Sequence, residues 1–189
     1  LLAAPSALAG AVVIVGMSLY LCWEIGGWIR DSGNGGIRAP GTRGNTPGIM
    51  DMFGQSFQLL VCVGVCVGLY TSSVNSFPMN SSTAYVLMGA IAFLFPMTLL
   101  RVIMSESLQG LLPVMTLRLI GRTLGPYCGL VLALSVLPGL GLNLIRMTEG
   151  WPLPVQLALL SGYGLYTCLV CTHLLGRFAW RCQARLDWE

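Results

Sequence analysis

Long apolar runs with almost no charge constrain this chain more than any other feature. Successive runs are separated by short segments that carry most of the polar residues. About 20 apolar residues in a helix are enough to cross the hydrocarbon core of a bilayer. The runs predict five membrane-spanning helices, at about residues 5–28, 49–72, 83–104, 123–145 and 154–180.

The low charge content agrees with a membrane location. Charged residues make up 9% of the chain, against roughly 25% in a typical soluble domain. We therefore expect an all-α membrane protein, a helical bundle that forms one integral domain over residues 1–189. The net charge of +3 is too small and too scattered for a nucleic-acid surface.

The segment between the third and fourth runs predicts a different kind of element. A polar hinge at 105–110 is followed by PVMTLRLIGR, residues 113–122, which starts with a proline suited to the first turn of a helix. Within this segment Arg118 and Arg122 share one face, apart from the apolar residues. We expect a short amphipathic helix in the membrane interface, with both arginines toward lipid headgroups. The alternative is a helix that only links two spans.

The arginines predict the orientation. If five spans alternate, nine arginines fall on one side: Arg30, Arg38, Arg43, Arg101, Arg118, Arg122, Arg177, Arg181 and Arg185. Only Arg146 falls on the other side. Positive residues favour the cytoplasmic side, so we expect that side to be cytoplasmic, the N-terminal end to be outside, and the membrane to be a bacterial inner membrane.

Three polar residues are candidates for a site within the membrane. Glu24, Arg101 and His173 are expected at similar depth near the cytoplasmic face. Ionisable residues inside a membrane often mark functional sites. They form either a structural cluster, paired or reaching to the surface, or a proton or ligand site.

Metal binding is not expected from the cysteines. Cys168 and Cys171 have the C-x-x-C spacing, but a structural zinc needs four ligands and no second Cys/His cluster exists. His173 is a candidate axial ligand for a haem or pigment. We therefore expect no metal and no cofactor, with a bound lipid or pigment as the open alternative.

Small residues recur at a spacing that favours close helix packing. Gly64 and Gly68 form one G-x-x-x-G pair, and Gly121, Gly125 and Gly129 repeat the spacing. Such residues let helix backbones approach each other. We expect these faces to pack within the bundle or against a neighbouring subunit.

Catalytic patterns are missing from the sequence. No G-x-S-x-G, P-loop, H-E-x-x-H or G-x-G-x-x-G occurs. We therefore expect a non-enzymatic accessory or scaffold subunit of a larger membrane complex, with other integral membrane subunits as partners. The alternatives are a binding or transport protein for a lipid or small hydrophobic molecule, and a pigment- or haem-ligating subunit that uses His173.

The second half of the chain resembles a known class of proteins. FLFPMTLLRVIMSESLQGLLPVMTLRLIGRTLGPY and, further on, LLGRFAWRCQARLDW are similar to segments of uncharacterised bacterial multipass membrane proteins. In that class a proline-containing span precedes a Ser/Gly hinge, a Pro-led amphipathic segment and another span. The resemblance implies the fold and transfers no catalytic residue.

Overall fold

The computed structural model describes residues 3–35, 48–76 and 82–186, and within these ranges the regular structure is helical, without strands. The long helices are α1 (Ala3–Gly33), α2 (Ile49–Ser76), α3 (Ser82–Ser105), α5 (Leu124–Met147) and α6 (Leu153–Cys182). The short ones are the 3-10 helices η1 (Leu108–Leu111) and η2 (Gln183–Arg185) and the α-helix α4 (Pro113–Arg122). The all-helical class predicted from sequence is confirmed.

Four segments are long and apolar enough to cross a membrane: Met52–Ser76, Ser82–Ser105, Leu124–Met147 and Leu153–Arg185. They correspond to the expected spans at 49–72, 83–104, 123–145 and 154–180, with ends that differ by a few residues. The expected first span, 5–28, falls inside α1, and its crossing of the membrane stays a prediction.

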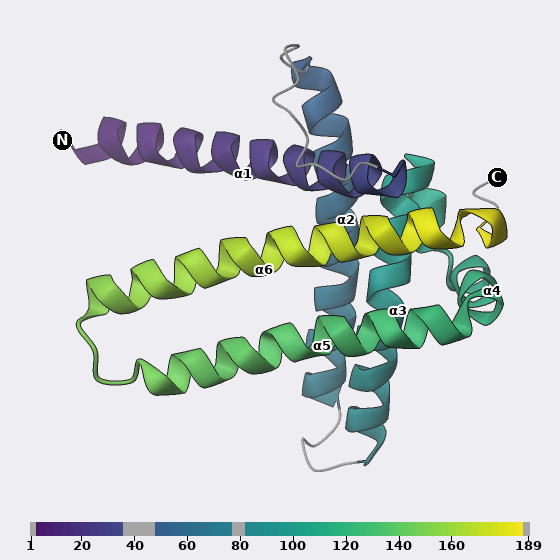
Figure 1. The fold of residues 1–189 in the computed structure, drawn as a ribbon. Coiled ribbons are helices and arrows are strands. Elements are labelled where there is room, and N and C mark those ends of the chain that lie inside the picture. The colour runs from purple at the N-terminus through teal and green to yellow at the C-terminus, as the bar shows by residue number, and fades with distance from the viewer. Residues whose placement is uncertain (1–2, 36–47, 77–81, 187–189) are drawn as a thin grey trace.

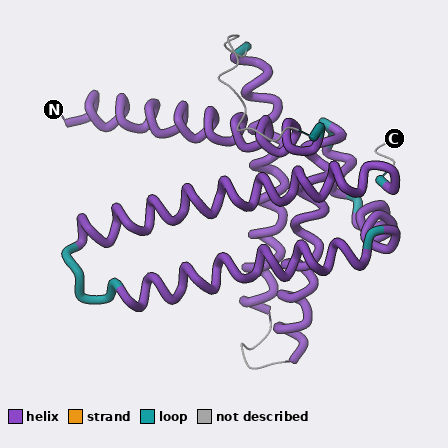
Figure 2. Tube along the Cα trace, in the orientation of Figure 1, coloured by secondary structure: helices purple, strands orange, loops and turns teal. Residues whose placement is uncertain are grey.

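The long helices run in two directions. In Figure 1, α1, α6 and α5 lie side by side, and the hairpin of α2 and α3 crosses them. The α5–α6 connection lies at the far end of its layer from α4 (Figure 2). Crossing helices touch over a short length only, so much of each hairpin extends beyond the crossing.

Buried side chains gather near one end of the molecule, which we call the base (residues 26–33, 97–130 and 172–186). Its core consists mainly of Ile29, Met97, Leu100, Ile103, Leu119, Ile120, Tyr127, Leu130, Leu175, Phe178, Ala179, Cys182 and Leu186. The Tyr127 ring packs edge-on against Phe93, with 5.1 Å between centroids. Its hydroxyl donates a hydrogen bond to the Phe93 carbonyl, one turn before the helix-internal Pro96.

Helix α1 continues past residue 28, the expected end of the first span, into the Gly-, Pro- and Asn-rich loop that precedes the second span. Residues 29–33 are the last turns of α1; Ile29 is fully buried and Ser32 is buried as well. They stay helical because they pack on α6 at Gly176, where an added Cβ would collide with the Ser32 side chain and the Ile29 carbonyl. Most of the remaining loop lies outside the described residues.

A sharp corner joins α4 to α5. The short helix α4 covers the residues expected for the interfacial helix, 113–122, and begins at Pro113. Its last turn is followed by the fully buried Thr123, whose hydroxyl donates to the Leu119 carbonyl at 2.9 Å. Before α4, the chain packs closely, since a Cβ on Gly110 would lie 2.8 Å from the backbone nitrogen of Val102. The position of α4 in a membrane interface stays a prediction.

Candidate functional site

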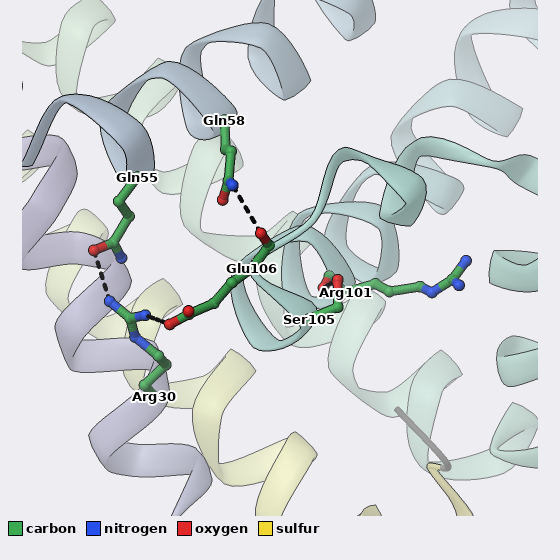
Figure 3. Close-up of polar contacts among 6 residues, drawn as sticks. All are labelled: Arg30, Gln55, Gln58, Arg101, Ser105 and Glu106. Atoms are coloured by element: carbon green, nitrogen blue, oxygen red, sulfur yellow. Dashed lines mark hydrogen bonds and ion pairs between the residues drawn. The ribbon is translucent and has the colours of Figure 1, made fainter. Parts of the chain in front are cut away.

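Four polar side chains join α1, α2 and the end of α3 beside the base (Figure 3). Arg30 of α1 forms an ion pair with Glu106, and its Nη2 donates to Gln55 Oε1 of α2 at 2.6 Å. Gln58, one turn further along α2, donates from Nε2 to the Glu106 carbonyl at 2.8 Å. We call Arg30, Gln55, Gln58 and Glu106 the polar clamp, because they tie three separate chain segments together.

The backbone of Glu106 adopts an unusual conformation. Its φ of 50° is the left-handed one that usually ends a helix at a glycine. A residue with a side chain pays roughly 1–2 kcal/mol for this conformation. Here the side chain reaches Arg30 while the carbonyl accepts from Gln58, so both ends of the residue contribute to the clamp.

A cavity of about 410 Å³ borders the clamp. It is lined by Trp23, Arg30, Met50, Gly54, Gln55, Gln58, Ile103 and Glu106. One cation, one anion and two amides thus face a space that also has an apolar side. This mixture suits a polar group attached to a hydrophobic body better than a fully apolar molecule.

Gln55 packs closely against α1 at Gly26, which has no side chain. A Cβ on Gly26 would overlap the Gln55 amide nitrogen, so this contact requires a glycine. The same nitrogen is buried without a hydrogen-bond partner. Because the amide oxygen is engaged by Arg30, the nitrogen remains the free donor of the clamp.

Glu24, Arg101 and His173, which sequence reasoning grouped together, each make their hydrogen bond to a different residue. Tyr20 donates to Glu24 Oε1 at 2.8 Å within α1. Arg101 Nη2 donates to the thioether sulfur of Met115 at 2.8 Å. His173 Nδ1 lies 3.1 Å from Ser32 Oγ. A common site for the three residues stays a prediction, as does axial ligation by His173.

Arg101 differs most from its expected environment. Sequence position favours an arginine that reaches the surface, but its side chain is 9% exposed and its Nη1 is buried without a partner. Figure 3 shows it pointing away from Arg30 and Glu106. The expected headgroup residues Arg118 and Arg122 are exposed on α4.

The glycines expected to pack have open space around them. An added Cβ at Gly64, Gly68, Gly121, Gly125 or Gly129 would meet nothing within 4 Å. Close helix contacts within the chain instead use Gly26 and Gly176. The faces that carry the five predicted glycines are therefore free to receive a helix from outside the chain.

Sequence reasoning missed the polar clamp. Its signal was present in Gln55 and Gln58, two amides three residues apart in an otherwise apolar run. Such a pair shares a helix face and, in a membrane segment, calls for polar partners. The charged partners were also visible in the sequence, because Arg30 lies near the C-terminal end of α1 and Glu106 directly follows α3.

Metal ligands do not gather in the part of the chain that the structure describes: no group of three or more His, Cys, Asp or Glu side chains could hold an ion. No protein-family model matches the chain, and neither the curated proteins nor the solved structures give a significant match. The resemblance to bacterial multipass proteins stays a prediction.

Proposed function

We propose that this chain is a non-catalytic accessory or scaffold subunit that packs its exposed helices against other integral membrane proteins. The observation that carries the proposal is the α5–α6 arm (residues 132–170). Its apolar side chains extend well outside the core, as at Leu132 and Leu142, which are 68% and 61% exposed. The chain therefore builds its core at the base and leaves a long helical hairpin available to neighbours.

Glycine positions favour protein neighbours over lipid alone. Lipid tails satisfy exposed apolar side chains as well as another protein does, so exposure by itself does not choose between them. Small residues favour a protein neighbour, because they allow two helix backbones to approach and gain van der Waals contact. Gly64 and Gly68 on α2 lie on an exposed face with open space at both positions.

The arginines support an orientation for the proposed subunit. All arginines of the described residues except Arg146 lie in the base, whereas Arg146 lies at the tip of the α5–α6 arm. We place the base toward the cytoplasm of a bacterium, following the positive-inside tendency. The α5–α6 arm then extends from that side into the bilayer.

The size of the particle released from native membranes tests the subunit proposal. We expect the chain in mild detergent to migrate with a partner, and Gly68→Leu to release it while the thermal unfolding temperature stays unchanged. Gly16→Leu, on α1 outside the arm and also surrounded by open space, serves as the matched control. A stable monomer without any copurifying protein would contradict the proposal.

A groove between α2 and α3 favours a second candidate function, the binding of a small hydrophobic molecule or an acyl chain. The groove has a volume of about 520 Å³. Its lining is almost entirely apolar: Val63, Cys66, Val67, Tyr70, Met88, Gly89, Ile91, Ala92 and Phe95. Mass spectrometry of the purified chain tests this second function. We expect a hydrophobic molecule to copurify with the chain and to be displaced by Gly89→Leu.

A further inference from the structure

A buried cation without a counter-charge lies at the end of α3. Arg101 is four residues from the last residue of that helix, and only 9% of its surface is exposed. Its Nη1 has no hydrogen-bond partner. Its Nη2 donates to the sulfur of Met115, which is a weak acceptor. The guanidinium therefore loses its water and gains little in return.

The carboxylates of the described residues do not compensate this charge. Within the ranges that the structure covers, none lies at ion-pairing distance from Arg101. Glu106 is paired with Arg30 on the opposite side of α3, and Glu24 accepts from Tyr20. A buried charge without a partner is strongly destabilising, so an anion from outside these residues would be bound with a large gain.

The helix that covers Arg101 has a cationic face at this point. Met115, Arg118 and Arg122 recur at intervals of three and four residues on α4, so they share one face of the helix. Met115 is 45% exposed and has a flexible side chain, and Arg118 beside it is exposed. If the Met115 side chain turns outward, Arg101 opens to the surface next to Arg118.

We propose that Arg101 and Arg118 bind the phosphate group of an anionic lipid, which replaces the Met115 sulfur as the partner of Arg101. Arginine forks match phosphate oxygens through paired, charge-assisted hydrogen bonds. Arg101 lies about 6 Å from the end of the apolar helix α3, at 1.5 Å per residue, which is the depth of lipid headgroups.

A lipid fits this place better than a free anion or an acidic protein segment. Val114 and Leu117 on α4 are 69% and 54% exposed, so apolar surface adjoins the cationic face. A phospholipid offers both an acyl chain for that surface and a phosphate for the arginines. The site is separate from the helix faces of the proposed subunit function and does not depend on them.

Thermal unfolding of the delipidated full chain in a neutral detergent tests the proposal. The probes are short-chain phosphatidylglycerol, short-chain phosphatidylcholine and inorganic phosphate. We expect phosphatidylglycerol to raise the unfolding temperature most, because the other lipid carries a compensating ammonium group and free phosphate lacks the acyl chains. Arg101→Met should weaken phosphatidylglycerol binding by about tenfold to a hundredfold.

The matched control is Arg146→Gln, which removes an exposed arginine at the tip of the α5–α6 arm and should leave the lipid response intact. Without lipid, Arg101→Met should unfold at the same temperature as the parent chain or higher, because it removes an uncompensated buried charge. If Arg101→Met retains the full response to phosphatidylglycerol, the proposal is wrong. An equal response to inorganic phosphate would show that the site binds a free anion and would overturn the proposal of a lipid.

A second variant keeps the proposal testable if Arg101→Met does not fold. Met115→Leu preserves the bulk of the side chain and removes the sulfur acceptor. It should lower the unfolding temperature without lipid and enlarge the rise caused by phosphatidylglycerol, since the lipid-bound form does not use the sulfur. An unchanged rise would contradict the proposal. No rise with any of the lipids would also overturn the proposal.

Discussion

The base and the α5–α6 arm are built from similarly apolar helices, yet they bury their side chains very differently. In the base, Met97 and Leu100 are fully buried. In the arm, Leu132 and Leu157 are 68% and 55% exposed. Composition does not explain this difference, because the four leucine and methionine side chains compared all belong to segments apolar enough to cross a membrane. It comes from the crossing of the helices, which gives the base neighbours on several sides.

Stability and recognition reside in different parts of the molecule. Side chains packed on all sides in the base determine whether the chain folds. Side chains in the arm can change without loss of internal contacts, so they are free to fit lipid or a partner. Matched substitutions in the two regions should therefore have effects of different size, and in one case of opposite sign.

The largest difference is expected for two glycines of α6. Gly176→Ala puts a methyl group against Ser32 and the Ile29 carbonyl and should destabilise the fold by about 1–3 kcal/mol. Gly162→Ala, in the arm, meets open space and should stabilise the helix by up to about 1 kcal/mol. Thermal or denaturant unfolding in micelles measures both. Equal effects of the two substitutions would remove the distinction between base and arm.

The next largest difference is expected for two tyrosines that donate to backbone carbonyls. Tyr127→Phe removes a hydrogen bond within the core and should cost about 1–3 kcal/mol. Tyr163→Phe in the arm breaks the 2.5 Å bond to the Leu137 carbonyl and should cost about 0.6 kcal/mol, the average for such bonds in membranes.

Unfolding in micelles measures the two phenylalanine variants under the same conditions. Both substitutions remove one hydroxyl and keep the ring, so their difference reports the surroundings of the bond. A larger cost at Tyr163 than at Tyr127 would show that the hairpin of α5 and α6, rather than the base, limits stability.

The ion pair of the polar clamp should contribute less to stability than the Tyr127 hydrogen bond. Glu106 is 68% exposed in its ion pair with Arg30, and exposed pairs contribute about 0–1 kcal/mol after screening by water and salt. Glu106→Gln should therefore lower stability by less than about 1 kcal/mol, with a smaller loss at high salt. Glu149→Gln, at the exposed α5–α6 turn, is the control and should have no effect. A loss that does not respond to salt would rule out the ion pair as its cause.

The sequence was sufficient for the helices but not for their packing. Apolar run length located α2, α3, α5 and α6, and Pro113 with the two arginines located α4. In a membrane protein most helix faces are apolar, so periodicity does not reveal which face meets a neighbour. For this reason the crossing of the two hairpins was not predictable from the pattern of residues.

The spacing of small residues also did not reveal which helix faces pack within the chain. The spacing of Gly64 and Gly68 predicted close packing, but the internal contact uses Gly176, with the buried Thr172 four residues before it. That pair has the same small-residue spacing and would have been found by a search that admits threonine.

The candidate site was only partly accessible to sequence reasoning. Arg101 was recognised as a functional candidate, but its burial depends on α4 folding back over the end of α3. The clamp depends on Glu106 adopting a left-handed backbone, which a glutamate rarely does. The burial of Arg101 and the backbone conformation of Glu106 both arise from tertiary packing, so the sequence signals the clamp only through the Gln55 and Gln58 pair.

Site-specific crosslinking in native membranes tests directly whether the α5–α6 arm binds a neighbouring subunit. A photo-reactive residue at Leu142, on the exposed arm, should give a discrete crosslink to another membrane protein, and one at the buried Leu100 should not. We expect the adduct at Leu142 to contain the same partner in repeated preparations. Adducts with lipid alone at Leu142 would contradict the proposal that the arm binds a neighbouring subunit.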